Sequence, residues 1–212
     1  MASRPRRYRH ARVDALVGAA ALSSLLFIAL IAVPALEPAR LARHAGHVPL
    51  LYAHIAGGVG MLIGGAIALR IGLTREWFAW HKPAGYAYLA LGTLGAAIAL
   101  ARSFDTAHTP GVSTGMLAAA WLAFTAMAYR AVRHRRYDQH REWMIRSYVL
   151  AWTFVFCRFW TRAAPDSLQG TDNDMIWATW VGPILLAEMA LQWKRGARLA
   201  PAASSPRAPT AR

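Results

Sequence analysis

The sequence predicts an all-α membrane protein, a bundle of six transmembrane helices with both termini in the cytoplasm. Three observations support this fold class. The 212-residue chain is 56% apolar and yet carries a formal net charge of +14. These two properties are separated along the chain, because nearly uncharged runs of about twenty residues alternate with short Arg-rich segments. In addition, 19 of the 24 Lys and Arg residues fall on one predicted side, which the positive-inside rule assigns to the cytoplasm.

Each apolar run is long enough to cross roughly 30 Å of hydrocarbon at about 1.5 Å per residue. The first run follows a basic cytoplasmic segment at 1–12 and exceeds the h-region of a signal peptide, about 7–15 residues, so we expect an uncleaved anchor. The later runs are bounded by prolines, charges or polar loops. The predicted spans, which together form a transmembrane domain at 13–195, are 15–36, 49–69, 83–101, 112–132, 143–163 and 175–193. A tail rich in Ala, Pro, Ser and Arg follows at 196–212 and is predicted to be disordered.

The composition also narrows the classes of function. A nucleic-acid-binding role is disfavoured because the basic residues lie between apolar spans, where they orient helices and contact the anionic headgroups of the lipid bilayer. The single cysteine, Cys157, excludes an intramolecular disulfide and a CxxC pair. Nucleotide-binding and hydrolase motifs such as Walker A, HExxH and GxSxG are absent. The sequence therefore indicates a multi-pass membrane protein and favours no enzyme class.

Two histidines begin predicted spans on the cytoplasmic side, His81 before the third span and His140 before the fifth. Two neutral imidazoles at equal depth on facing helices are what a bis-His b-type haem requires. Helical spacing also predicts a glycine stripe, which either admits a flat ligand or lets another helix approach closely. An interfacial hydrogen-bonding role for each histidine stays open beside ligation. The hypothetical haem site comprises His81, His140, Gly85, Tyr88, Arg141 and Arg146.

A further histidine, His54, opens the second span at the outer side. Its candidate partners at similar depth are His108, His44 and His47, which would complete an outer haem or, with Asp105, a divalent metal site such as zinc. The predicted metal ligands are accordingly His54 and His108, and a metal-dependent membrane enzyme is the third functional hypothesis.

The only acid well inside a predicted span is Glu188, which we expect to face the bundle and pair with a basic group. Arg146 is the first candidate partner and Arg70 the second, while Arg158 lies five turns beyond His140 on the same predicted helix. A polar network of Arg146, Glu188 and Arg158 supports the alternative hypothesis, a cofactor-free membrane transporter or scaffold.

The segments HIAGGVGMLIGGAIALR, WHKPAGYAYLALGT and HREWMIRSYVLAWTFVFCRFW resemble the predicted bacterial membrane proteins of domain-of-unknown-function family 2306. The resemblance spans His54 to Arg158 and implies an inner-membrane helical protein without supplying an activity. A weaker similarity is to the transmembrane ascorbate-dependent b-type cytochromes, in which helix-borne histidines hold two haems. That similarity would make His81 and His140 the ligands of one haem, although the fourth span lacks a histidine. The leading hypothesis is b-type haem electron transfer, with a quinone or another redox partner left open.

Overall fold

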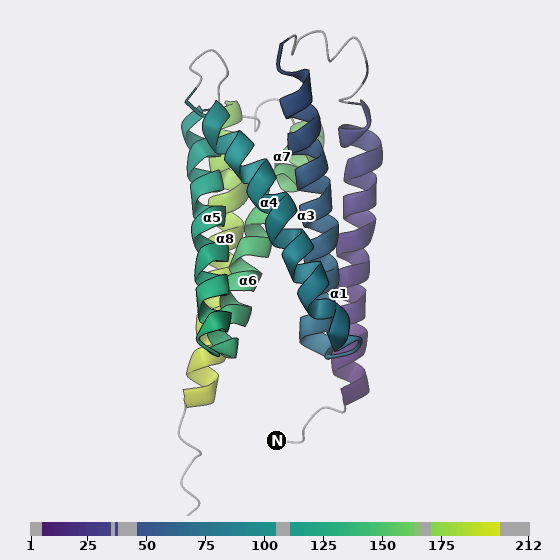
Figure 1. Ribbon diagram of the computed structural model, residues 1–212, viewed down its shortest axis with the longest axis vertical. Coiled ribbons are helices and arrows are strands. Elements are labelled where there is room, and N and C mark those ends of the chain that lie inside the picture. Colours follow the sequence, from purple (N-terminus) through teal and green to yellow (C-terminus); the bar gives the residue numbers. More distant parts are fainter. Residues whose placement is uncertain are drawn as a thin grey trace, which may run out of the picture.

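The computed structural model describes residues 6–34, 37, 46–104, 111–163, 165 and 171–199, and its regular structure in these ranges is entirely helical. Figure 1 shows long helices that stand side by side, with the start of α1 and the end of α8 at the same end of the bundle. A π-helical turn, η1 (Ile28–Ala32), continues α1, and a 3₁₀ turn, η4 (Phe78–Trp80), precedes α4. The main helices are α1 (Arg6–Phe27), α3 (Val48–Thr74), α4 (His81–Arg102), α5 (Gly111–Arg133), α6 (Tyr137–Ala151), α7 (Thr153–Ala163) and α8 (Asp172–Leu199).

Within the described residues, five helical segments are long and apolar enough to cross a membrane. They correspond to five of the six predicted spans. The first is shorter than predicted, and the other four are longer. The all-α class and the multi-pass character are therefore confirmed. The five segments are Val13–Ala32, Val48–Thr74, Phe78–Arg102, Gly111–Arg133 and Asn173–Gly196.

The predicted fifth span at 143–163 is not one helix. It begins earlier, at Tyr137, and is divided at Trp152 into α6 of 15 residues and α7 of 11 residues. At the division the Thr153 hydroxyl donates to the Leu150 carbonyl oxygen at 2.8 Å, a local bond of the kind that bends helices. Hydropathy does not register this break because both halves remain apolar.

Two further boundaries differ from the prediction. Helix α1 begins at Arg6, so the basic segment at 1–12 is partly helical, and α8 continues to Leu199, into the tail predicted to be disordered. The rest of that tail, 200–212, lies outside the described residues.

Glycines on α3 allow α4 to pack directly against its backbone. A Cβ added at Gly57 would lie 2.8 Å from the Leu91 carbonyl oxygen and 3.1 Å from the Gly95 nitrogen, and one at Gly64 would lie 3.3 Å from the Tyr88 nitrogen. Of the two uses left open for the glycine stripe, close helix packing therefore accounts for these positions.

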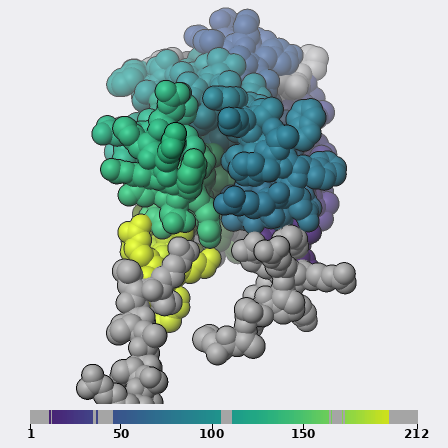
Figure 2. Space-filling view, turned by 60° about the horizontal axis from the view of Figure 1, so that its bottom comes forward, coloured from purple at the N-terminus to yellow at the C-terminus, as the bar shows by residue number. Residues whose placement is uncertain are grey.

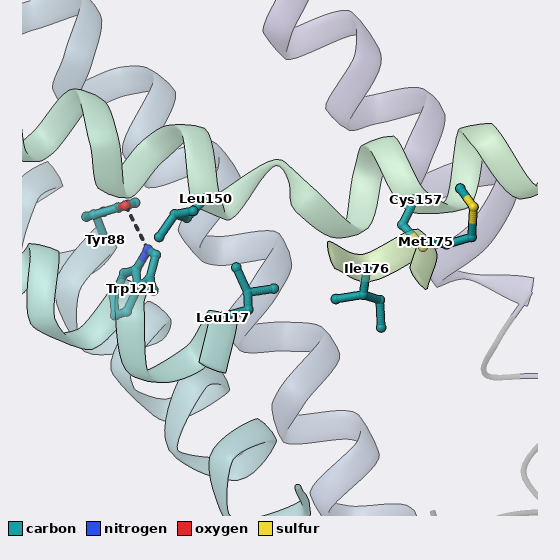
Figure 3. Packing of buried hydrophobic residues seen from close by; sticks show 7 residues of the cluster. All are labelled: Tyr88, Leu117, Trp121, Leu150, Cys157, Met175 and Ile176. Carbon is teal, nitrogen blue, oxygen red and sulfur yellow. Dashed lines mark hydrogen bonds between the residues drawn. The ribbon is translucent and has the colours of Figure 1, made fainter. Parts of the chain in front are cut away.

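Other glycines make room for aromatic rings in the centre of the bundle. The ring of Tyr148 occupies the space beside Gly65, and the ring of Trp121 lies against Gly92. Tyr88 is fully buried between them, and Figure 3 shows the hydrogen bond that joins it to Trp121. This aromatic centre links the α3–α4 pair to α5 and α6.

We expect Gly57→Ala to destabilise the protein by about 1–3 kcal/mol, because the new methyl group meets backbone atoms that have no room to move. The matched control is Gly58→Ala, since a Cβ at Gly58 would have no neighbour within 4 Å. Thermal unfolding of the purified protein in detergent, followed by circular dichroism, measures the difference. Equal midpoints for the two variants would contradict the proposed role of Gly57.

Candidate functional site

The first candidate ligand, His81, is the first residue of α4 and is anchored to the preceding helix. Its Nδ1 lies 3.2 Å from the carbonyl oxygen of Ala68 on α3. The imidazole stacks on Phe78, with ring centroids 5.2 Å apart and planes 9° apart. Gly72 provides the space for this position, because a Cβ there would lie 3.0 Å from the His81 ring. The ring is therefore fixed on three sides by α3 and η4.

The second candidate ligand, His140, is anchored in the same way to its own preceding helix. Its Nδ1 lies 2.9 Å from the carbonyl oxygen of Ala128 on α5. The two hydrogen bonds span 13 residues in one case and 12 in the other. In each helical hairpin, α3–α4 and α5–α6, a histidine at the start of the second helix therefore bonds to a carbonyl oxygen of the first helix.

These hydrogen bonds determine which imidazole nitrogen carries the proton. A carbonyl oxygen only accepts, so the Nδ1 of His81 and of His140 must donate, and in the neutral ring Nε2 then keeps its lone pair. Metal-bound histidines in proteins commonly show this arrangement, in which an Nδ1–H bond to a carbonyl orients the ring and increases the basicity of the ligating nitrogen.

The two histidines lie at the same end of the bundle. Helices α4 and α6, which carry them in their first turns, both begin at this end, and Figure 2 shows a hollow here between the α3–α4 hairpin and the α5–α6 hairpin. Gly85, one turn beyond His81, has no atom within 4 Å of its Cβ position. The structure thus places His81 and His140 at one end of the bundle, on the two hairpins that flank this hollow.

Both turns that lead into these histidines contain left-handed residues other than glycine. Arg75 and Trp77 have φ values of 64° and 54° in the turn before His81, and Arg135 has a φ of 58° in the turn before His140. Such conformations are unfavourable for residues with a Cβ and persist where the surrounding structure imposes them. The positions of both histidines are therefore defined by tight turns.

Three of the other residues assigned to the haem site lie elsewhere. Tyr88 is buried in the aromatic centre, where its hydroxyl donates to the Ser147 hydroxyl at 3.0 Å and accepts from the Trp121 Nε1–H at 3.0 Å. Arg141 lies in a small surface depression between α6 and α8. Arg146 is also directed toward α8. The structure therefore does not bring Tyr88, Arg141 or Arg146 to the hollow between the histidines.

Arg146 and Glu188 instead form the centre of a network that joins α6 to α8. The Arg146 Nε and an Nη donate to one Glu188 carboxylate oxygen at 2.8 and 2.6 Å, and the guanidinium lies 4.8 Å from the centroid of the Trp143 ring. Glu142 lies 3.8 Å from Arg146 and accepts from Arg195 at 2.6 Å. Of the two partners considered for Glu188, Arg146 forms the ion pair. Arg70 pairs instead with Asp14 and Glu76.

His54 and Arg158 lie together at the opposite end of the molecule. The His54 Nδ1 is 3.1 Å from the carbonyl oxygen of Gly95 on α4, and the ring lines a cavity of about 680 Å³ that Arg158 and Arg162 also line. Arg158 is therefore not part of the Arg146–Glu188 network. Sequence reasoning missed Arg162, although its position four residues after Arg158 places both on one helical face.

The predicted metal site at this end is only partly within the described residues. His44, Asp105 and His108 lie outside them. In the part of the chain that the structure describes, no three His, Cys, Asp or Glu side chains are grouped as metal ligands would be. His54 is the one described histidine that lines the cavity, so the described residues do not supply bis-His ligation there.

The fold and its buried polar contacts define a multi-pass helical membrane protein. The chain belongs to DUF2306, a family of predicted membrane proteins, whose family model matches residues 51–191. The matched range includes His54, His81 and His140 with their carbonyl partners, as well as Arg146 and Glu188. No curated protein and no solved structure matches the chain.

We expect Glu188→Ala to destabilise the protein by about 1.5–3 kcal/mol, the usual contribution of hydrogen bonds to a charged group. Arg146 is only 8% exposed and would keep only the longer contact with Glu142 and the Trp143 ring. The matched control, Glu76→Ala, removes an exposed partner of Arg70 and should cost about 1 kcal/mol or less. Unfolding midpoints in detergent measure both changes. Equal losses would show that the Arg146–Glu188 pair contributes no more to stability than the exposed Arg70–Glu76 pair.

Proposed function

We propose that the chain crosses the bacterial inner membrane six times, with both termini in the cytoplasm. Helices α6 and α7 follow one another between α5 and α8, and together they supply the remaining crossing. The start of α1 and the end of α8 at one end of the bundle support an even number of crossings (Figure 1). The excess of Lys and Arg at that end supports a cytoplasmic location for it.

A reporter fusion tests this topology. Alkaline phosphatase fused after Leu199 should be inactive, because the enzyme requires export, and green fluorescent protein at the same place should fluoresce. Alkaline phosphatase inserted after Phe104, between α4 and α5, should be active. An active phosphatase at the C-terminal position would contradict a six-crossing arrangement.

We further propose that His81 and His140 bind a b-type haem and that the protein transfers electrons. The observation that carries this proposal is the pair of Nδ1 bonds to Ala68 and Ala128, which leaves an Nε2 lone pair on each of two rings at the same end of the bundle. A haem bound there would accept and release single electrons. The residues of the chain would hold the two rings in position and exclude water from the site.

The surroundings of the two histidines fit a flat apolar group with an edge near the membrane surface. The open position at Gly85 leaves space beside His81, and Phe78 covers one face of its imidazole. Lys82 follows His81 directly and is exposed, so it is placed to meet a propionate at the interface. It is a better candidate for this role than Arg146, which is already paired with Glu188.

The alternative is a cofactor-free transporter or scaffold, and the Arg146–Glu188 network favours the scaffold form. Its charges are paired with one another and join α6 to α8, which is what an architectural network requires. In this interpretation the histidine bonds serve only to hold each hairpin closed. The two proposals differ in one observable, the visible absorption spectrum.

We expect the purified protein from haem-replete cells to show a Soret band that His81→Ala and His140→Ala each abolish, because each substitution removes an axial nitrogen. His134→Ala is the matched control, since His134 is exposed in the turn between α5 and α6 and should leave the band unchanged. Absorption spectra of the oxidised and reduced protein provide the measurement.

Circular dichroism and gel filtration must accompany the spectra, because each alanine also removes a hydrogen bond between helices. External imidazole added to a folded His81→Ala or His140→Ala variant should restore the band by occupying the vacated position. Colourless wild-type protein that is folded and monodisperse would exclude haem and leave the scaffold.

A further inference from the structure

The cavity beside His54 has apolar walls formed by many elements. It has a volume of about 680 Å³, within the range of about 300–1,000 Å³ typical of small-molecule sites. Its walls come from α3 to α7 and from the end of α1 with its π-helical turn. The apolar wall includes Phe27, Ile31, Leu51, Leu117, Trp121 and Phe154.

Positive charge is concentrated around this cavity. Arg158 and Arg162 line it, and Arg102 lies close enough to His54 to interact with it electrostatically. Within the described residues, no carboxylate forms an ion pair with any of these three arginines. Only five Lys and Arg residues were assigned to this end from the sequence, and two of the five, Arg158 and Arg162, line this cavity. Positive-inside topology disfavours basic residues here, which suggests that they serve a purpose other than orientation.

His54 adds a neutral polar group next to these cations. Its Nδ1 donates to the Gly95 carbonyl oxygen, so in the neutral ring Nε2 remains a hydrogen-bond acceptor. The cavity therefore combines an apolar interior with two arginines and one acceptor.

Two local features keep the interior open. Gly58 lines the cavity and has no atom within 4 Å of its Cβ position, so this glycine is not explained by helix packing. The π-helical turn Ile28–Ala32 places Ile31 and Ala32 on the wall, and π-helical turns occur frequently at functional sites.

We propose that this cavity binds a single-chain amphiphile with an anionic head group, such as a fatty acid or a lysophospholipid. The head lies at Arg158 and Arg162, since guanidinium groups bind carboxylate and phosphate oxygens through paired hydrogen bonds. The hydrocarbon chain occupies the apolar interior beside Gly58. This inference is independent of the haem proposal, because the two sites share no residue.

Equilibrium binding of tritiated palmitate to the full-length protein in phosphatidylcholine nanodiscs tests the proposal. Binding should be saturable, and hexadecanol, which has the same chain without the charge, should compete at least about tenfold more weakly. The double variant Arg158→Gln/Arg162→Gln should weaken palmitate binding by about tenfold or more and remove the preference for the acid.

Gly58→Leu should abolish binding by filling the cavity, whereas Gly18→Leu, at an exposed glycine of α1 that is equally free of neighbours, should have no effect. Arg133→Gln, at the opposite end of α5, is the control for loss of charge. Competition by palmitoyl lysophosphatidylglycerol identifies the head group: tenfold stronger competition than palmitate indicates a phosphate ligand, and weaker competition a carboxylate. Equal competition by palmitate and hexadecanol, or wild-type binding by folded Gly58→Leu, would overturn the proposal.

Discussion

The hydrogen bonds between histidine Nδ1 and a carbonyl oxygen of the neighbouring helix are the interactions on which the arrangement of the bundle depends. Hydrocarbon offers no water to a buried N–H group, so a histidine within a span must find its partner in the protein. His54 on α3 donates to Gly95 on α4, and His81 on α4 donates to Ala68 on α3. This hairpin is therefore joined near both of its ends, and His140 joins α6 to α5 in the same manner.

The middle of the bundle joins these hairpins through aromatic side chains. Tyr88 bonds to Trp121 and to Ser147, so a single hydroxyl connects α4 with α5 and α6. The Tyr148 hydroxyl donates to the Leu62 carbonyl oxygen at 3.2 Å, which connects α6 with α3. Because glycines provide the space for these rings, the glycine content of α3 and α4 follows from packing. Gly58 and Gly85 are different, since they face open space.

Much of this architecture could be predicted from the sequence, and the exceptions have physical causes. Long apolar runs predict membrane helices because their length can be read directly along the sequence. A lone acid within a span, Glu188, predicts a basic partner because an unpaired carboxylate is costly to remove from water. The division at Trp152 depends on local hydrogen bonding rather than on hydropathy. The partners of the three histidines are backbone carbonyls, which every residue carries, so no residue type marks them. The cavity around His54 depends on side chains from six helices, α1 and α3 to α7, and no sequence pattern predicted it.

The same hydrogen bond serves both helix packing and ligand binding, so these two roles do not exclude one another. A bond from Nδ1 to a carbonyl consumes one nitrogen and fixes the direction of the other. At the end with the tight turns, two hairpins each carry such a ring. At the opposite end, one such ring, His54, lines an apolar cavity together with Arg158 and Arg162. The first arrangement suits a group held by two nitrogens, whereas the second suits a ligand that brings its own negative charge. The same type of hydrogen bond, from Nδ1 to a carbonyl oxygen, therefore orients a histidine at each end of the α3–α4 hairpin, and the two ends suit different ligands.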